Sequence, residues 1–260
     1  MCARYTMRLG AQTVRDLFSV EEVPEVEPRY NVSPTNEMPV VGEDKEGHRH
    51  VRLMRWGLVP FWAKDVSIGQ RLINAKSETA HEKPAFKQAL ERRRCLIPAD
   101  GFYEWMEVEE APAGGGEELD LFGDPRPSTR APSRKPKTYK QPYHFTLKGG
   151  APFAFAGLYE RWSGPSEPNR TSPNPTEPPL YSFTVLTCEP NALVAQLHDR
   201  MPVIVLPEDY DRWLDRDLKD PEAVQDILRP LPAELMQSRP VNRLVGNPIY
   251  DSPELLDDPA

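Results

Sequence analysis

Short runs of aromatic and β-branched residues, separated by proline-rich segments, constrain the fold of this chain more than any other feature. The clearest runs occupy residues 143–147, 153–162, 181–187 and 202–206, and their composition is typical of β-strands. Each run is too short to be stable on its own. We therefore expect these strands to pair with one another in a single sheet-based core.

Two segments rich in proline, glycine and charged residues interrupt the strands, at residues 107–141 and 163–179. Both have little hydrophobic periodicity, which predicts surface loops. Because the short strands beside them are stable only when paired with one another, the loops are expected to interrupt one domain, residues 1–245, without dividing it. Residues 246–260 form an acidic C-terminal tail in this prediction.

Helical patterns are fewer than strand patterns. Amphipathic candidates lie at residues 13–19, 83–93 and 207–216, the second with a proline in its first turn. Helices and strands do not alternate regularly, which disfavours a doubly wound parallel sheet. We predict an α+β fold with a mostly antiparallel, barrel-like β core and peripheral helices.

Composition favours an intracellular globular protein. Apolar residues make up 38% of the chain and include five tryptophans, enough for a core, and no apolar run approaches the roughly 20 residues of a membrane-spanning helix. The N-terminus lacks the apolar region of a secretory signal. Cys2, Cys95 and Cys188 lie far apart and form no CxxC pair, which argues against a disulfide framework or a zinc ribbon.

The net charge of −8 argues against nucleic-acid binding only if the charge is evenly spread. Residues 1–100 contain 16 Lys and Arg against 14 Asp and Glu, whereas residues 208–260 contain 6 against 13. The acidic excess is therefore C-terminal, and a basic surface in the first part of the chain is compatible with the sequence.

The opening MCARY raises the possibility of unusual chemistry at Cys2, which would carry a free amine and a thiol on adjacent carbons if Met1 were removed. The ordinary pKa values of these groups are about 8 and about 8.5, so both have a nucleophilic fraction near neutral pH. An aldehyde could form an imine with the amine, and the nearby thiol could then close a thiazolidine ring. The dipeptide alone favours an incidental cysteine.

Asn74 lies in the stretch QRLINAKSE, after an apolar pair. Strand alternation there would leave its amide available to orient a substrate or the terminal amine. The alternative is a turn-forming asparagine that caps the next helix, and this reading is preferred for Asn74 taken alone. Arg71 and Lys76 bracket Asn74 as phosphate contacts would.

Two further side chains have the chemistry of proton transfer. Glu104 lies between Tyr103 and Trp105 in CLIPADGFYEW, where desolvation would raise its pKa, although it could equally face solvent on the opposite side of the strand. His198, in LHDRMP, titrates near neutral pH. A structural salt bridge within this triplet is the competing interpretation.

Taken together, these pieces resemble the SRAP family, the SOS-response-associated peptidases that are also called abasic-site processing proteins. The resemblance spans nearly the whole chain in collinear order. It is carried by MCARY at the start, RYNVSPT at 29–35, RWGLVPFWAKD at 55–65, INAKSET at 73–79, CLIPADGFYEW at 95–105, KQPYHF at 140–145, FAGLYERW at 155–162, LHDRMPVIV at 197–205 and VNRLVGNP at 241–248.

The resemblance implies a protein that recognises abasic sites in single-stranded DNA and links to them through Cys2 after removal of Met1. It implies that Asn74 positions the amine, that Glu104 moves protons and that His198 assists opening of the deoxyribose. The DNA contacts that it implies are Arg4, Lys76 and Arg200 at phosphates, with Arg71 a weaker candidate, and Phe61 and Trp62 stacked on a base.

The same resemblance implies a monomer without cofactor, metal or membrane partner, located in the cytoplasm or nucleoid of a prokaryote or in the nucleus of a eukaryote.

Two departures from the family pattern bear on activity. Ala3 replaces a glycine, which matters if that position needs a positive φ or a close approach of DNA. Lys76 replaces an arginine and so loses the planar fork that suits phosphate.

Two other functions use the same residues. In an N-terminal-nucleophile peptidase or amidohydrolase, Cys2 would attack an amide and Asn74 would help to hold the oxyanion. A non-catalytic single-strand binder would use only the basic and aromatic surface.

Overall fold

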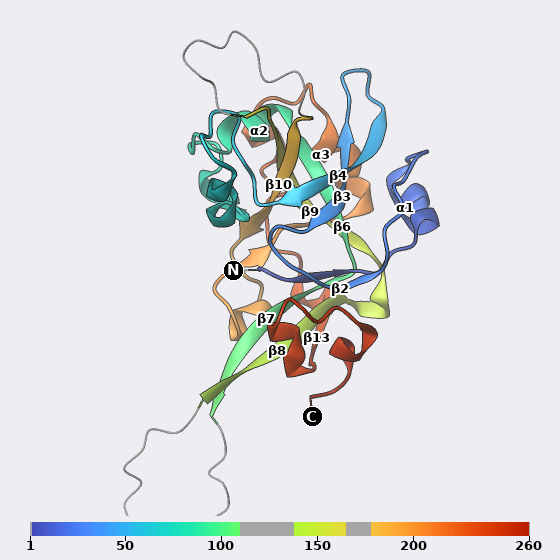
Figure 1. The fold of residues 1–260 in the computed structure, drawn as a ribbon, viewed down its shortest axis with the longest axis vertical. Helices are drawn as coiled ribbons and strands as arrows, with labels where there is room; N and C mark the ends of the chain where they lie inside the picture. Colours follow the sequence, from blue (N-terminus) through green and yellow to red (C-terminus); the bar gives the residue numbers. More distant parts are fainter. Residues whose placement is uncertain (1, 110–137, 165–177, 260) are drawn as a thin grey trace, which may run out of the picture.

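Five strands close into a barrel in the computed structural model, which describes residues 2–109, 138–164 and 178–259 (Figure 1). In order around the barrel they are β4 (Arg49–Trp56), β3 (Glu37–Glu43), β6 (Arg94–Ala99), β9 (Phe153–Trp162) and β10 (Leu180–Cys188). The barrel closes because β10 pairs with both β9 and β4. The β4–β10 pairing is parallel, and the other pairings around the barrel are antiparallel.

Three short strands extend the barrel. Strand β5 (Asn74–Lys76) runs parallel to β10, β11 (Met201–Pro202) pairs with β10, and β12 (Ile204–Val205) pairs with β9. Strand β10 thus carries β5 and β11 near its C-terminal end. This arrangement brings residues 74–76 and 201–202 together although they are far apart in the sequence.

A second, antiparallel sheet packs below the barrel in the view of Figure 1. Its order is β13 (Met236–Pro240), β8 (Thr138–Leu147), β7 (Gly101–Glu109), β1 (Tyr5–Met7) and β2 (Arg29–Val32). The chain passes from β6 of the barrel almost directly into β7.

A close approach between β7 and β8 requires glycine at the start of β7. A Cβ atom at Gly101 would lie 2.1 Å from His144 Nε2 and 2.9 Å from the Phe145 carbonyl oxygen. A larger residue would therefore push the two strands apart.

The helices are short and lie on the periphery. Helix α1 covers Ala11–Phe18, α2 covers Lys87–Arg92 and α3 covers Tyr210–Leu214. The short 3-10 helices in the described residues are η1 Val66–Arg71, η2 Ser77–Thr79, η3 Lys148–Gly150, η4 Val194–Gln196, η5 Pro207–Asp209, η6 Pro221–Val224, η7 Ala233–Leu235, η8 Arg243–Gly246 and η9 Pro253–Leu256.

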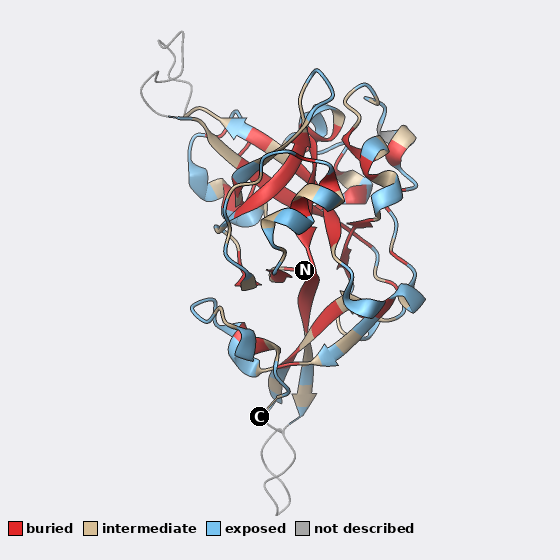
Figure 2. Ribbon diagram, turned by 90° about the vertical axis from the view of Figure 1, so that its right-hand side faces the viewer, coloured by how far each residue is buried: buried red, intermediate tan, exposed pale blue. Residues whose placement is uncertain are grey.

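Buried apolar side chains form one large core cluster, to which strands of the barrel and of the second sheet both contribute. Figure 2 shows the buried residues concentrated in these strands. A smaller cluster lies on the other face of the second sheet, where Tyr103 packs with Val241, Val245 and Leu255. Strand β7 is therefore covered on both faces, by the barrel on one and by the C-terminal segment on the other.

The C-terminal segment contacts the second sheet. Leu255 is buried, and Asp251 accepts hydrogen bonds from the main-chain N–H groups of Tyr30 (2.6 Å) and Asn31 (2.9 Å). One acidic residue of the predicted acidic C-terminal tail thus satisfies the backbone of β2.

The structure confirms the α+β prediction, with a mostly antiparallel, barrel-like core and few helices. Part of the expected loop at 107–141 is strand, since β7 continues to Glu109 and β8 begins at Thr138. Residues 110–137 and 165–177 of the expected loops lie outside the described residues. Among the helices that the structure describes, none has the length and apolar character needed to cross a membrane.

Candidate active site

Cys2 lies at the junction of the barrel and the second sheet. Strand β1 pairs with β7 in the register Tyr5↔Phe102, and the N–H of Tyr103 donates to the carbonyl of Arg4 (3.0 Å). This pairing holds the N-terminal residues beside β7, where the Cys2 thiol lies within electrostatic reach of Glu104. The Cys2 side chain is 1% exposed, and its thiol donates to the Arg4 carbonyl at an S···O distance of 3.6 Å.

Burial raises the pKa of the Cys2 thiol well above its usual range, and the negative charge of Glu104 raises it further. The thiol is therefore protonated at neutral pH in this state. This differs from the sequence-based expectation of a partly ionised thiol, because the sequence does not reveal that residue 2 is buried.

Asn74 holds the main chain of Cys2. It is the first residue of β5, whose parallel pairing with β10 places Asn74 opposite Val185. Its Nδ2 donates to the Cys2 carbonyl oxygen (2.7 Å). Its Oδ1 is buried and accepts no hydrogen bond from the residues that the structure describes. Asn74 thus fixes Cys2 and retains one acceptor.

Glu104 is 2% exposed, which excludes the solvent-facing alternative. Strand alternation puts Glu104 on the same face as Phe102, toward the barrel, while Tyr103 and Trp105 face the C-terminal cluster. Burial raises the pKa of Glu104 to about 7, and the nearby charge of Asp199 contributes to the rise. A carboxyl group with this pKa exchanges protons near neutral pH.

His198 follows η4 in the turn that leads into β11. Its Nδ1 accepts a hydrogen bond from the N–H of Arg200 (3.0 Å), and burial lowers its pKa. Asp199 Oδ1 is also 2.8 Å from Nδ1, but that carboxylate is 86% exposed. The lowered pKa makes the neutral imidazole the main form at neutral pH.

The structure thus brings the four predicted residues of the reaction into one region. Asn74 bonds to Cys2, the charge of Glu104 acts on the Cys2 thiol, and the turn of His198 is close enough for Asp199 to act on Glu104. Together they provide a thiol, an amide acceptor, a carboxyl group near neutrality and a neutral imidazole. Such a set can orient a nucleophile and move protons.

The predicted aromatic and basic residues that remain accessible lie in the turn before η1, at the end of η1 and on β5. Phe61 and Trp62 are 52% and 47% exposed. Trp62 and Arg71 line one cavity of about 400 Å³ beside η1, and Lys76 is exposed two residues after Asn74. These four side chains are free to meet a ligand from solvent.

Arg4 and Arg200 are placed differently. The Arg4 guanidinium donates to Asn31 Oδ1 and to the Val245 carbonyl, both at 2.8 Å. The Arg200 guanidinium donates to both carboxylate oxygens of Glu78. In this structure both groups bind protein atoms, so their contact with phosphate stays a prediction. Sequence reasoning missed Asn31 and Glu78, although each lies inside a motif that carried the resemblance.

Ala3, which replaces the family glycine, does not have a positive φ. The described residues other than glycine that do are Ser19 and Thr35. The local backbone therefore does not require glycine at position 3.

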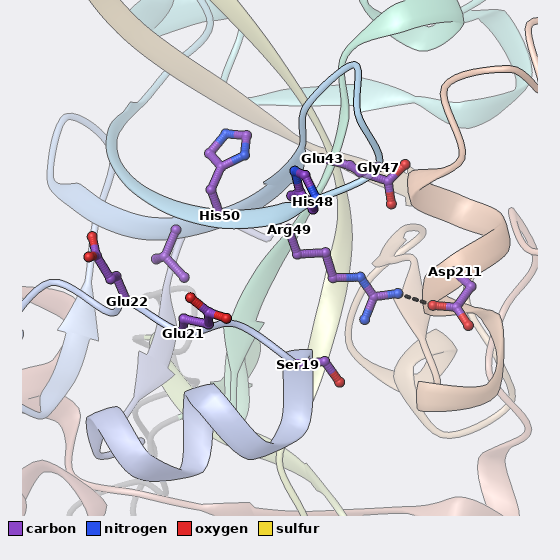
Figure 3. A pocket seen from close by; sticks show the side chains of 10 residues that line it. Ser19, Glu21, Glu22, Glu43, Gly47, His48, Arg49, His50 and Asp211 are labelled. Carbon is purple, nitrogen blue, oxygen red and sulfur yellow. Dashed lines mark hydrogen bonds and ion pairs between the residues drawn. The ribbon is translucent and has the colours of Figure 1, made fainter.

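A separate cavity of about 770 Å³ opens between α1, the β3–β4 hairpin and α3 (Figure 3). Arg49 points toward Asp211 there and forms an ion pair with it. The residues that line this cavity do not include any of the predicted site residues. Across the described residues, His, Cys, Asp and Glu side chains form no group of three or more that could hold a metal ion.

The fold and the site together define a class of proteins. In this class, a closed five-stranded barrel and a second sheet enclose Cys2, and the amide of Asn74 and the carboxyl group of Glu104 lie beside it. The chain belongs to the SRAP family, described as SOS response associated peptidase, whose sequence pattern matches residues 1–122 and 128–248.

Named relatives and a solved structure agree with this assignment. The chain is 38% identical over 260 residues to the abasic site processing protein YoqW of Bacillus subtilis (strain 168), covering 99% of each. It is 28% identical to the abasic site processing protein HMCES of Gallus gallus, covering 98% of this chain and 77% of that protein. A crystal structure from Bacteroides thetaiotaomicron shares the fold, with a TM-score of 0.75 at 22% identity and 99% coverage of both chains.

Proposed function

We propose that this protein captures abasic sites in single-stranded DNA by forming a thiazolidine between Cys2 and the ring-opened sugar, after Met1 has been removed. The observation that carries the proposal is the placement of Cys2, whose carbonyl is held by Asn74 and whose thiol lies within the electrostatic reach of Glu104. The names of the relatives, which refer to abasic sites, support the choice of substrate.

The chemistry needs no cofactor. The terminal amine attacks the C1′ aldehyde, and loss of water gives an imine. The Cys2 sulfur then bonds to the same carbon while its proton passes to the imine nitrogen. The product is a five-membered ring, and the overall reaction releases one water.

Each neighbouring side chain has a role that its environment supports. The unused Oδ1 of Asn74 is an acceptor for an N–H of the new terminal amine, which orients the nitrogen lone pair toward the substrate. Glu104, with a pKa of about 7, takes the proton from the thiol and returns it to nitrogen or to departing water. The imidazole of His198 assists opening of the sugar ring.

The protonated resting thiol favours this order of events. A thiol whose pKa is raised by burial is a weak nucleophile until a base removes its proton. The amine therefore reacts first and the thiol second, when Glu104 can accept its proton. Hydrolysis of the imine would reverse the adduct, whereas β-elimination of the 3′ phosphate from the imine would constitute a lyase-type activity. Met1 would be removed either by this site or by a housekeeping aminopeptidase.

Intact-mass measurement after mixing the purified protein with single-stranded DNA that carries one abasic site tests the proposal. The expected product is a heat-stable adduct whose mass equals protein lacking Met1 plus DNA minus one water. The Cys2→Ser variant keeps the amine but cannot form a stable thiazolidine, so it should give no heat-stable adduct. An adduct of equal stability with Cys2→Ser, or none with the wild type, would refute the proposal.

The Cys2→Ser variant also distinguishes thiazolidine formation from the peptidase alternative. A serine in place of Cys2 could still attack an amide, so cleavage of amide substrates by both proteins would favour a peptidase. Binding of undamaged single strands without any adduct would leave only the non-catalytic binder.

A further inference from the structure

Phe61 and Trp62 are the central residues of a tight turn, residues 60–63, which we call the aromatic turn. The N–H of Ala63 donates to the Pro60 carbonyl (2.9 Å) and closes the turn. Both aromatic side chains are exposed, whereas Val59 before the turn and Ala63 at its end are buried. The turn therefore presents two rings to solvent from a buried base.

Side chains of β9 and β10 bind the main chain on each side of these rings. The N–H of Val59 donates to the hydroxyl oxygen of Ser182 (2.8 Å), a buried residue of β10. After the rings, Trp162 Nε1 donates to the Ala63 carbonyl (2.8 Å). The chain is therefore tied to the barrel both before and after the exposed rings.

Glu160 binds the aromatic turn between these two points. Glu160 is 4% exposed, and its carboxylate accepts a hydrogen bond from the N–H of Phe61. Arg93 Nη2 (2.8 Å) and the N–H of Arg161 (2.9 Å) donate to the same carboxylate. A buried carboxylate needs such donors because it has lost its hydration. The main chain of Phe61 is therefore held by an acceptor that is itself fixed in place.

The three anchoring side chains lie on one face of the barrel wall. Ser182 is directly opposite Glu160 in the β9–β10 pairing, so the two side chains share a face. Trp162 is two residues further along β9 and lies on the same face. Together they bind the main chain at residues 59, 61 and 63, which alternate along the chain.

Two glycines close the base of the segment that carries the aromatic turn. A Cβ atom at Gly57 would lie 2.7 Å from the Gly69 carbonyl oxygen, and a Cβ atom at Gly69 would lie 2.5 Å from the Gly57 carbonyl oxygen. The two ends of the segment therefore meet main chain to main chain. Because the base is fixed, the three anchoring side chains decide the remaining orientation of the rings.

We propose that Glu160, Trp162 and Ser182 are positioning residues, which hold the aromatic turn ready to stack on a DNA base. The stacking rests on the proposed function, whereas the anchoring of the turn does not. Rings that are held in place before binding lose less conformational freedom when a base arrives, which strengthens binding. The assignment also gives a role to FAGLYERW, a stretch that supplies none of the predicted site residues.

Three anchor variants each weaken one of these bonds and leave both rings in place. Ser182→Ala removes the acceptor of the Val59 N–H, and Trp162→Phe removes the indole donor but keeps an aromatic side chain. Glu160→Gln replaces one acceptor oxygen by an amide N–H₂ donor. Thr184→Val is the matched control, because Thr184 is buried two residues after Ser182 and its hydroxyl has no hydrogen-bond partner among the described residues.

A double-mutant cycle measures the coupling between the anchors and the rings. Anisotropy titrations give the Kd for an undamaged single strand. Each anchor variant should weaken binding roughly fivefold, about the effect of one hydrogen bond. In a background that carries both Phe61→Ala and Trp62→Ala, the same variants should change Kd by less than about twofold, because the rings that they position are gone. Thr184→Val should match its parent in both backgrounds.

Hydrogen–deuterium exchange without DNA reports the anchoring itself. Main-chain N–H groups in residues 57–72 should exchange roughly fivefold faster in each anchor variant, since one local hydrogen bond is lost. Exchange in Thr184→Val should equal that of the wild type.

Each outcome decides the inference. Equal weakening of binding with and without the two rings would overturn it, because the anchors would then act on the fold in general. So would wild-type affinity, or wild-type hydrogen exchange, in all three anchor variants. A wild type that shows the expected coupling on undamaged strands yet forms no adduct with abasic DNA would refute the proposed function and leave the positioning role standing. If one anchor variant fails to fold, the other two decide.

Discussion

Replacing Glu104 by glutamine should make the protein more stable at neutral and alkaline pH. Burial raises the pKa of Glu104 from 4.5 to about 7. A carboxyl group with a higher pKa in the folded state binds its proton more tightly when folded, so its contribution favours folding at low pH. That contribution is complete below about pH 4.5 and is lost as the pH rises through about 7.

The magnitude follows from the two pKa values. Each tenfold change in a protonation constant corresponds to about 1.4 kcal/mol, so the rise to about 7 corresponds to about 3 kcal/mol. The free energy of unfolding of the wild type should fall by this amount between pH 4.5 and pH 8, relative to Glu104→Gln. The variant has no group that ionises at this position.

Urea unfolding at several pH values measures this difference. Glu109→Gln, at the exposed end of the same strand, is the matched control, and its curve should run parallel to that of the wild type. If the Glu104→Gln curve also runs parallel to the wild type across this range, Glu104 does not hold its proton at a raised pKa. Its proposed duty in proton transfer near neutral pH would then lose its physical basis.

Four other changes test the site and its support. Asn74→Ala should slow adduct formation roughly tenfold because the Cys2 main chain loses a hydrogen bond; equal rates in a denaturing gel assay would remove Asn74 from the site. His198→Ala should slow adduct formation at a closed-ring lesion and recover with a pre-opened aldehyde, and no recovery would contradict its ring-opening role. Trp62→Ala should weaken single-strand binding by roughly 1–3 kcal/mol in anisotropy titrations. An unchanged affinity would show that no base stacks on Trp62. Asp251→Ala should lower the free energy of unfolding by about 1.5–3 kcal/mol, and an unchanged urea midpoint would show that the C-terminal segment does not support β2.

Much of the candidate site could be predicted from the sequence because its chemistry depends on residue type. A cysteine at position 2, an asparagine in a strand and a histidine beside an aspartate are visible without a structure. The strand ranges were predictable for a similar reason, since aromatic and β-branched runs favour extended backbone. Closure of the barrel was harder to predict from the sequence, because it depends on the pairing of β10 with both β4 and β9.

The environment of Glu104 could not be predicted. Alternation along β7 separates Glu104 from Tyr103 and Trp105, and it does not say whether the face of Glu104 is covered. The structure covers both faces of the strand, one with the barrel and the other with the C-terminal cluster. The residues that cover them come from distant parts of the chain.

The groups available for reaction can be read from the sequence: the amine and thiol of residue 2, an amide, a carboxyl and an imidazole. Their protonation states depend on how the chain folds, since burial keeps the Cys2 thiol protonated and raises the pKa of Glu104 to about 7. The fold also decided that Arg200 meets Glu78, which lies 122 positions away in the chain. Charge and burial depend on neighbours in space, and the order of residues does not specify those neighbours until the strands have paired.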